Sequence, residues 1–287
     1  MDSYRRQQIE AKAKALLTEL GINELPVDPI AVAKALDIQV HAKAADASGS
    51  SGWLIRQGNN FAIVYATHVD NLGFQSFSVA HELGHYCLDG HPEHVFRLGN
   101  EHISRGAFSS SDPVEREADY FAACLLMPRH LCSSLVAKAK DGMAAVLSLA
   151  SACNTSLVAA AIRYTEIGHV ASGVVQCLNG RVEFCAIHPL QAHVGWARPL
   201  PRNSKPPMHS ATARLSADPL SVRGAQEDSE SLEASEWFSG ARSGIYLNEE
   251  VIGLGRFGRT LTLLTIEDGC YEEDEEETQE RHGLRFR

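Results

Sequence analysis

The segment His81-Glu82-Leu83-Gly84-His85 constrains this chain most, because it sets two histidines four residues apart in an apolar helical pattern. Small and apolar residues recur every three or four positions over residues 72–88, which predicts a helix. Residues four apart share a helix face, so both rings can reach one Zn²⁺, with Glu82 beside them as a base for a bound water. The alternative is a helix with two solvent-facing histidines, since a chain with 13 histidines can match by chance.

A second predicted helix offers the third ligand. Asp112 suits its N-cap and Pro113 its first turn. At about 100° per residue, Glu115 and Asp119 fall on a strip that continues into apolar residues, and Glu117 falls on the far side. Because buried carboxylates need a cation or hydrogen bonds, we predict Glu115 as the ligand and Asp119 as the acceptor for a ligating histidine N–H. The alternative is a capping box from Asp112 to Glu115, which leaves Asp119 unexplained.

Residues 77–85 and 115–128 together resemble the ImmA/IrrE family of zinc metallopeptidases, in the family's order and at a typical separation. The resemblance implies an α+β fold: a gluzincin-like metallopeptidase domain with an active-site helix and a small sheet. It also implies His81, His85 and Glu115 as ligands of one Zn²⁺, with Mn²⁺ as a substitute, and Glu82 as the catalytic base. The chain departs from the family at Asp119, where Asn is frequent.

The resemblance further implies a zinc-dependent endopeptidase. Its expected substrate is an XRE-type helix-turn-helix transcriptional repressor, cut to switch on stress or mobile-element genes. The alternative is a non-proteolytic regulator, in which a metal-stabilised fold binds a protein partner or DNA. Peptide hydrolysis also needs a group that stabilises the oxyanion, and Tyr86, His91, His94 and Arg129 are unranked candidates.

Composition indicates which partners and which cellular compartment to expect for the protein. A net charge of −10 argues against general affinity for nucleic acid or anionic membranes. Part of that charge lies in an acidic run within residues 271–287, for which we expect a solvated tail. The seven cysteines are scattered without a C-x-x-C pair, and neither a signal peptide nor an apolar run of membrane-spanning length is visible. We therefore expect a reduced, cytoplasmic protein; the sequence does not indicate its oligomeric state.

Residues 1–127 form the predicted metallopeptidase domain. Two helices, over residues 3–20 and 28–36, precede a short strand and a hairpin over residues 52–65. An extended substrate segment is expected to pair with the edge of this hairpin. Residues 89–111 are predicted as a loop in which His91, His94 and His102 are solvated, with a role in catalysis or in binding a second metal as the alternative.

Residues 128–167 are predicted as three helices with helix-turn-helix spacing over residues 146–164. The second of these two helices carries Arg163 and little else that is basic or amide-bearing. Reading DNA requires cations for the phosphates and Arg, Asn or Gln for the base edges. We therefore expect a packed helical subdomain that does not bind nucleic acid specifically.

Residues 168–270 are predicted as a mixed C-terminal α+β domain. Asn179-Gly180 between two apolar strands is a strong hairpin signal. The ImmA/IrrE family includes members with a sensor-like (GAF-like) domain at this place, but no motif here identifies one. Trp196, Trp237 and Phe238 are expected in the core or an interface, with a ligand pocket as the alternative.

Overall fold

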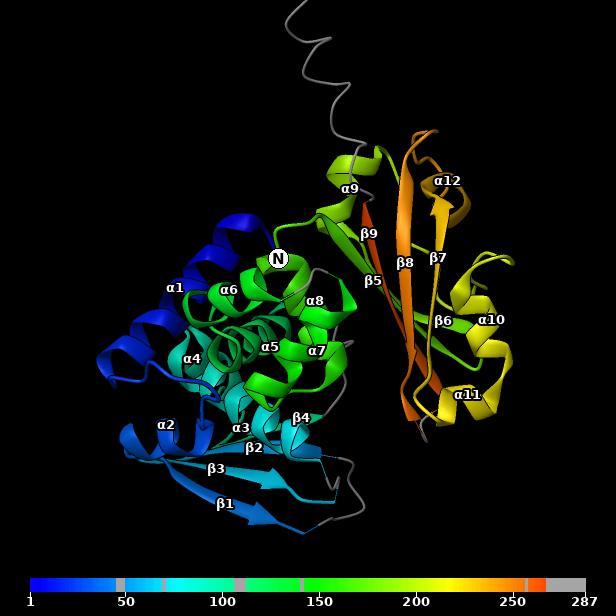
Figure 1. Cartoon of the computed structure of the whole chain (residues 1–287). Helices are drawn as coiled ribbons and strands as arrows, with labels where there is room; N and C mark the ends of the chain where they lie inside the picture. The colour runs from blue at the N-terminus through cyan, green and yellow to red at the C-terminus, as the bar shows by residue number, and fades with distance from the viewer. Residues whose placement is uncertain (45–49, 69–70, 106–111, 140–141, 256–257, 267–287) are drawn as a thin grey trace, which may run out of the picture. The chain divides into compact units, whose positions relative to one another are not determined.

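The structure is a computed structural model of the chain and describes residues 1–44, 50–68, 71–105, 112–139, 142–255 and 258–266 (Figure 1). Its contacts divide the chain into an N-terminal unit, residues 1–139 and 146–163, and a C-terminal unit, residues 140–145 and 164–287. Helices and sheets are mixed, as the α+β prediction requires. The predicted acidic tail, residues 271–287, lies outside the described residues. The predicted division into four parts stays a prediction.

The N-terminal unit contains a four-stranded sheet of order β1-β3-β2-β4. Its strands are β1 (Gln39–Lys43), β2 (Ser50–Gln57), β3 (Asn60–Ala66) and β4 (Glu101–Arg105). β2 and β3 form the predicted hairpin, β1 runs parallel to β3, and β4 runs antiparallel to β2. The predicted hairpin is therefore confirmed, within a larger sheet.

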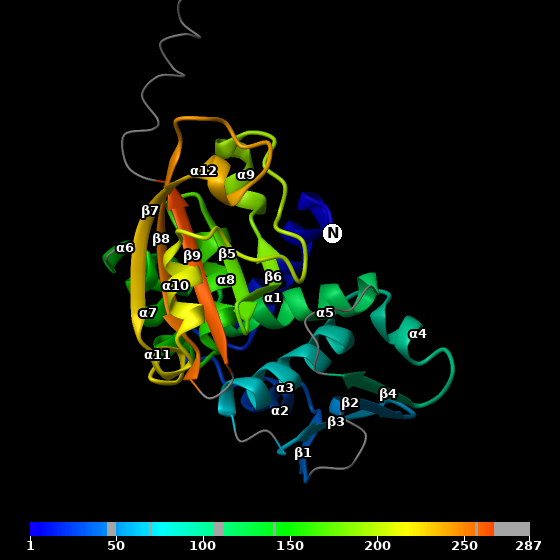
Figure 2. The same cartoon turned by 90° about the vertical axis from the view of Figure 1, so that its right-hand side faces the viewer.

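Two expectations for this sheet were wrong. The segment predicted as a loop contains a short helix, α4 (His91–Val95), and strand β4, which lies along β2 (Figure 2). Both hairpin strands consequently have neighbours on each side, so the hairpin offers no free edge to a substrate. Among the described strands, β1 and β4 are the outer ones.

Four helices of the N-terminal unit contribute to the core next to this sheet. They are α1 (Ser3–Glu19), α2 (Pro29–Ala35), α3 (Leu72–Cys87) and α5 (Pro113–Leu126). A side chain caps the start of each of these helices. In α5 this side chain is Asp112, as predicted, and its carboxylate accepts the N–H of Val114 at 2.9 Å. α3 packs on β2 and β3, and its other side packs against α5. The core between these elements consists of apolar residues such as Leu54, Ile63 and Leu83, all fully buried.

Small residues control the approach of α3 and α5. A methyl group added at Gly84 would lie 3.0 Å from the Cα atom of Ala118 and 3.1 Å from its carbonyl oxygen. Real Cβ atoms rarely come so close to backbone, so the two helices touch with no space between them. Gly84, the small residue inside the H-E-x-x-H segment, makes this close approach of the two helices possible.

Three further helices follow: α6 (Arg129–Lys138), α7 (Met143–Cys153) and α8 (Leu157–Ile167). α7 and α8 meet at 114°, within the range of about 90–120° found in helix-turn-helix motifs. Arg163 on α8 is buried, and it donates to the carbonyl of Met127 at 3.0 Å and to the carboxylate of Glu10 at 2.6 Å. This arginine is engaged inside the protein and is not available to DNA.

The described helices are too short or too polar to cross a membrane singly. Two bent helix pairs, α5 with α6 and α7 with α8, would pass by length and composition.

The C-terminal unit contains a five-stranded antiparallel sheet of order β6-β5-β9-β8-β7. Its strands are β5 (Ser172–Leu178), β6 (Arg181–Ala186), β7 (Glu227–Glu233), β8 (Tyr246–Gly253) and β9 (Arg259–Ile266). Asn179 and Gly180 join β5 to β6, and both have positive φ angles, 50° and 71°. These angles suit a two-residue hairpin turn, which confirms the hairpin predicted from the Asn-Gly pair.

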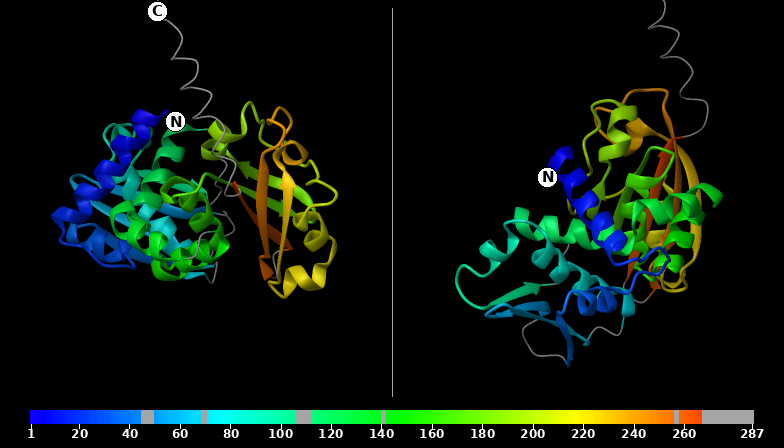
Figure 3. Two further views of the ribbon diagram at one scale, coloured as in Figure 1. Left: turned by 45° about the horizontal axis from the view of Figure 1, so that its top comes forward. Right: turned by 90° about the vertical axis from the view of Figure 1, so that its left-hand side faces the viewer.

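Short helices complete this unit: α9 (His188–Val194), α10 (Ala211–Ala217), α11 (Pro219–Arg223) and α12 (Ala234–Trp237). α10 and α11 lie along one face of the sheet (Figure 3). The buried Glu249 of β8 accepts hydrogen bonds from the N–H and the hydroxyl of Thr212, both at 2.6 Å. Trp237 and Phe238 are 1% exposed and belong to the core, as expected.

Gly84→Ala tests the contact between α3 and α5. In an open helix this change stabilises by about 0.5–1 kcal/mol. Here the new methyl group collides with α5, so we expect the free energy of unfolding to fall by about 1–3 kcal/mol. Urea denaturation measures the change. Gly99→Ala is the control, because nothing lies within 4 Å of its added Cβ. Equal stability of the two variants would contradict the close contact.

Candidate metal centre

The two motif histidines lie one turn apart on α3, and both are buried. Their Nε2 atoms are 3.1 Å apart. Glu115, in the first turn of α5, places one carboxylate oxygen 3.3 Å from Nε2 of His81 and the other 3.5 Å from Nε2 of His85. The structure thus brings the three predicted ligands into one cluster.

The spacing of these donor atoms suits a single divalent ion. A tetrahedral ion with bonds of about 2.1 Å holds its ligand atoms about 3.4 Å apart. The three separations in the cluster lie between 3.1 and 3.5 Å. Two imidazoles and one carboxylate form a donor set of catalytic zinc sites, which keep a fourth position for water or substrate. The residues present therefore fit Zn²⁺, while their chemistry also admits Mn²⁺.

The electrostatics of the cluster favour a cation. Burial opposes a charge on His81, yet its hydrogen bonds to Asp119 and Glu115 raise its pKa to about 10. Burial alone would raise the pKa of Glu115, but the neighbouring rings of His102, His81 and His85 hold it well below its ordinary value. In the metal-free protein, a proton on His81 supplies the positive charge beside these carboxylates. A bound divalent ion would supply that charge instead.

Asp119 lies one helical turn after Glu115 on α5. Its Oδ1 atom is 2.8 Å from Nδ1 of His81. An ionised carboxylate can only accept, so Nδ1 is the donor, and in a neutral His81 the lone pair of Nε2 is directed at the cluster. This arrangement is the one expected of a carboxylate that orients a ligating histidine.

Glu82 is completely buried, and neither of its carboxylate oxygens has a hydrogen-bond partner among the described residues. Burial raises its pKa, and the nearby His81 and His102, followed by the hydroxyl of Ser104, offset part of that rise. Gly52 on β2 makes room for the carboxylate, because a Cβ there would lie 2.6 Å from Oε1 of Glu82. An unpaired buried carboxylate costs free energy, so its presence beside the cluster points to a chemical role.

The other acids of α5 have different partners. Glu117 accepts from the guanidinium of Arg5 at 2.9 Å and lies 3.1 Å from Nε2 of His91. The carboxylate of Glu115 faces the histidines, and the carboxylate of Asp112 caps the start of α5. The carboxylate of Glu115 therefore lies where the ligand alternative requires it.

The expectation of solvated loop histidines was wrong for two of the three. His102 on β4 has its Nε2 atom 3.2 Å from Glu115 Oε1 and 3.2 Å from the hydroxyl of Ser104. His91 is buried, with Nδ1 3.3 Å from Nδ1 of His85. Both rings reach the cluster through tertiary structure that the local sequence does not signal: the pairing of β4 with β2, and the turn before α4. His94 is half-buried.

Two of the four candidates for oxyanion stabilisation are engaged elsewhere. Tyr86 packs edge-on against Phe61, with ring centroids 4.9 Å apart. Arg129 pairs with Glu10 at 3.1 Å. His102, which was not among the four, places a ring nitrogen beside the cluster.

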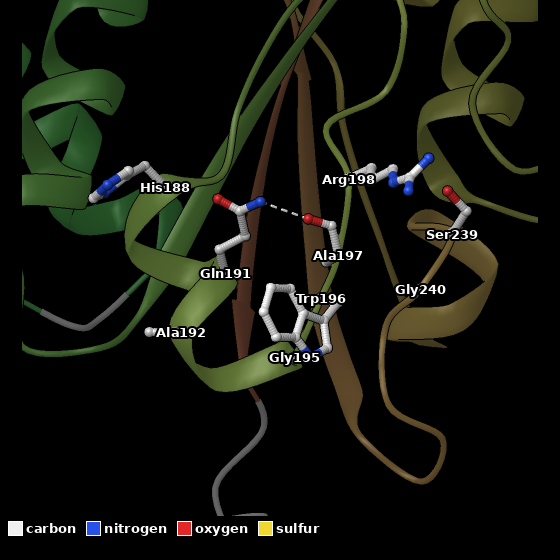
Figure 4. A pocket seen from close by; sticks show the side chains of 9 residues that line it. All are labelled: His188, Gln191, Ala192, Gly195, Trp196, Ala197, Arg198, Ser239 and Gly240. Atoms are coloured by element: carbon white, nitrogen blue, oxygen red, sulfur yellow. Dashed lines mark hydrogen bonds between the residues drawn. The ribbon is translucent and has the colours of Figure 1, made fainter. Parts of the chain in front are cut away.

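A hollow of about 920 Å³ lies in the C-terminal unit, between α9 and the turn at Ser239 (Figure 4). Trp196 projects into it and is 92% exposed. The side-chain amide of Gln191 donates to the carbonyl of Ala197 at 2.6 Å and shapes its wall. Trp196 therefore lines a hollow, whereas Trp237 and Phe238 lie in the core.

Comparisons with known proteins agree with this geometry. Residues 33–165 match the family model described as the IrrE N-terminal-like domain, which is classed among peptidases. Residues 33–165 are thus similar to the IrrE N-terminal-like domain, which confirms the resemblance found in the sequence. No curated protein matches the sequence. Among solved structures, a Mycobacterium tuberculosis transcriptional regulator is similar in fold, with a TM-score of 0.54 and 13% identity over 90% of this chain and 76% of that one.

Single substitutions test the cluster. His81→Ala, His85→Ala and Glu115→Ala should each lose the one divalent ion per chain that the wild type retains, because each removes one of three donors. Elemental analysis of the purified proteins measures the ion. His41→Ala, at an exposed histidine of β1, is the control. Full metal retention in Glu115→Ala would move the third ligand to another residue.

Proposed function

We propose that this chain is a zinc-dependent endopeptidase, with His81, His85 and Glu115 as the metal ligands and Glu82 as the base. The observation that carries the proposal is the buried carboxylate of Glu82, which has no hydrogen-bond partner among the described residues and lies beside a convergent His-His-Glu cluster. The peptidase classification of the matching family supports the same conclusion.

The residues divide the work of peptide hydrolysis. When bound, Zn²⁺ acidifies a coordinated water and polarises the peptide carbonyl. Glu82 takes the proton from the attacking water and passes it to the leaving amine nitrogen. Its raised pKa suits both steps, because the carboxylate must accept a proton and then release it. Gly52 keeps the carboxylate close to the cluster.

We infer that His102 stabilises the charge that develops on the carbonyl oxygen, once its Nε2 atom is released from Glu115. Its ring centroid lies 4.5 Å from that of His85, and its Nε2 atom is within 3.2 Å of a ligand carboxylate. It belongs to β4, an outer strand among the described ones, where an extended peptide can add main-chain hydrogen bonds. A substrate paired with β4 would run past both His102 and the metal ligands.

The substrate class comes from the family resemblance. We propose an XRE-type helix-turn-helix repressor, whose cleavage releases stress or mobile-element genes from repression. Pairing along a strand edge demands little of the side chains in the substrate, so specificity must also come from contacts outside β4.

A cleavage assay tests this function. The Zn²⁺-loaded protein is incubated with the helix-turn-helix protein encoded beside it, and fragments are measured by gel electrophoresis and mass spectrometry. Fragments should form with the wild type and vanish with a chelator. Glu82→Gln should keep the metal and the melting temperature and lose cleavage, because an amide of the same shape cannot take a proton. Residual cleavage within tenfold of the wild type would refute the role of Glu82.

His102→Ala separates transition-state stabilisation from binding. We expect kcat to fall by about 10²-fold with a small change in KM, as for the loss of one oxyanion donor, while the zinc content stays at one per chain. Glu101→Gln, at the exposed neighbour on β4, should behave like the wild type. A kcat within threefold of the wild type would contradict the role. Loss of zinc would reassign His102 to positioning Glu115.

The rival function is a metal-stabilised regulator without proteolysis. The similar fold of a protein named as a transcriptional regulator favours it. Against direct DNA binding stand the net charge of −10 and the burial of Arg163. Retention of regulatory activity by Glu82→Gln, together with saturable binding to its own promoter at physiological salt, would favour this rival.

A further inference from the structure

The ring of His85 has a second nitrogen, which contacts a chain of polar groups behind the metal centre. Nδ1 of His85 lies 3.3 Å from Nδ1 of His91, a side chain that is almost completely buried. Nε2 of His91 lies 3.1 Å from a carboxylate oxygen of Glu117. Glu117 in turn accepts two hydrogen bonds from Arg5, at 2.9 and 2.5 Å. The contacts thus run continuously from α3 through α4 and α5 to α1.

The direction of the hydrogen bonds in this chain is set by Glu117. Its carboxylate has no proton to give and is held by a cation, so the N–H of the contact must belong to Nε2 of His91. A neutral His91 then has a bare lone pair on Nδ1, which can only accept. The donor to it is therefore Nδ1–H of His85, and Nε2 of His85 is left without a proton, facing Glu115 and His81.

We propose that His91, Glu117 and Arg5 are positioning residues that fix the proton of His85 on Nδ1 and so prepare its Nε2 atom to bind the metal. The inference rests on the metal centre of the proposed function. In this proposal His91 orients the ring of His85, as Asp119 orients the ring of His81. His81 meets its carboxylate directly, whereas His85 meets one through an intervening imidazole.

The local sequence explains how His91 reaches this place. α3 ends at Cys87, and the chain reverses at Gly90, whose φ of +83° is one that glycine adopts without strain. His91 follows at once as the first residue of α4, beneath the ring of His85 at a centroid distance of 5.3 Å. Glu117 comes two residues after Glu115 on α5, so it leaves the helix on another side and reaches His91 instead of the metal centre.

Imidazole nitrogen spectra of the metal-free protein test the proton position directly. With ¹⁵N-labelled histidine, long-range ¹H–¹⁵N correlations distinguish the two tautomers of His85. The wild type should show the Nδ1–H form. His91→Phe keeps the ring volume but removes the acceptor, and His85 should then change to the Nε2–H form. A wild-type His85 in the Nε2–H form, or a tautomer that does not respond to His91→Phe, would overturn the proposal.

Metal affinity supplies the second readout. Competition with a chromophoric chelator for Zn²⁺ alone should give a Kd about 10- to 100-fold higher for His91→Phe and Glu117→Leu, the cost typical of losing an outer partner of a ligating histidine. Glu117→Gln keeps an acceptor oxygen and should recover most of that loss. Glu93→Gln, an exposed acid on α4, is the matched control and should bind as the wild type does. Circular dichroism of each protein verifies the fold.

The outcomes separate this inference from the proposed function. Normal Zn²⁺ binding by the wild type, with unchanged Kd in both His91→Phe and Glu117→Leu, would refute the positioning chain and leave the metal centre standing. Failure of the wild type to bind Zn²⁺ would refute the metal centre, and the tautomer spectra would still decide whether His91 orients His85. Loss of cleavage with normal metal affinity and the expected tautomers would refute only the peptidase activity.

Discussion

The contact between α3 and α5 is the constraint on which the rest of the site depends. Gly84 lets the backbone of α5 approach to the distance of a van der Waals contact at Ala118. Each helix then presents a pair of polar residues one turn apart, His81 with His85 and Glu115 with Asp119. Because both pairs have the same rise of about 6 Å, the carboxylates meet the histidines at two levels, and His81 contacts both acids.

Two carboxylates in this site experience opposite electrostatic environments. Histidines surround Glu115 and hold its pKa down, whereas burial without a hydrogen-bond partner among the described residues holds that of Glu82 up. Opposite shifts in neighbouring acids assign them different roles. The acid that stays ionised suits a metal ligand, and the acid that readily takes a proton suits a base. The two pKa values differ because the acids lie on different helices and because Gly52 on β2 leaves space in which the carboxylate of Glu82 is buried.

The sequence predicts the parts of the site that depend on helical periodicity. The spacing of His81 and His85, the cap at Asp112 and the inward strip of α5 all follow from a repeat of 3.6 residues. His102 and His91 do not, because one depends on β4 pairing with β2 and the other on a reversal at Gly90. Their segment is rich in turn-forming residues, so local pattern predicts a loop. The residues of β4 do not signal a strand either, because the apolar Ile103 is 51% exposed whereas the polar Ser104 is buried.

Metal binding and folding are linked in this arrangement, because the ligands come from two helices that pack together only in the folded N-terminal unit. An ion that binds the folded chain alone stabilises it by RT ln(1 + [L]/Kd), about 2.7 kcal/mol at a hundredfold excess over Kd. The positioning residues His91, Glu117 and Arg5 lie outside the cluster and act on the same metal-binding equilibrium. By holding the donors in place before the ion arrives, they lower the cost of assembling the site, so their contribution appears in Kd.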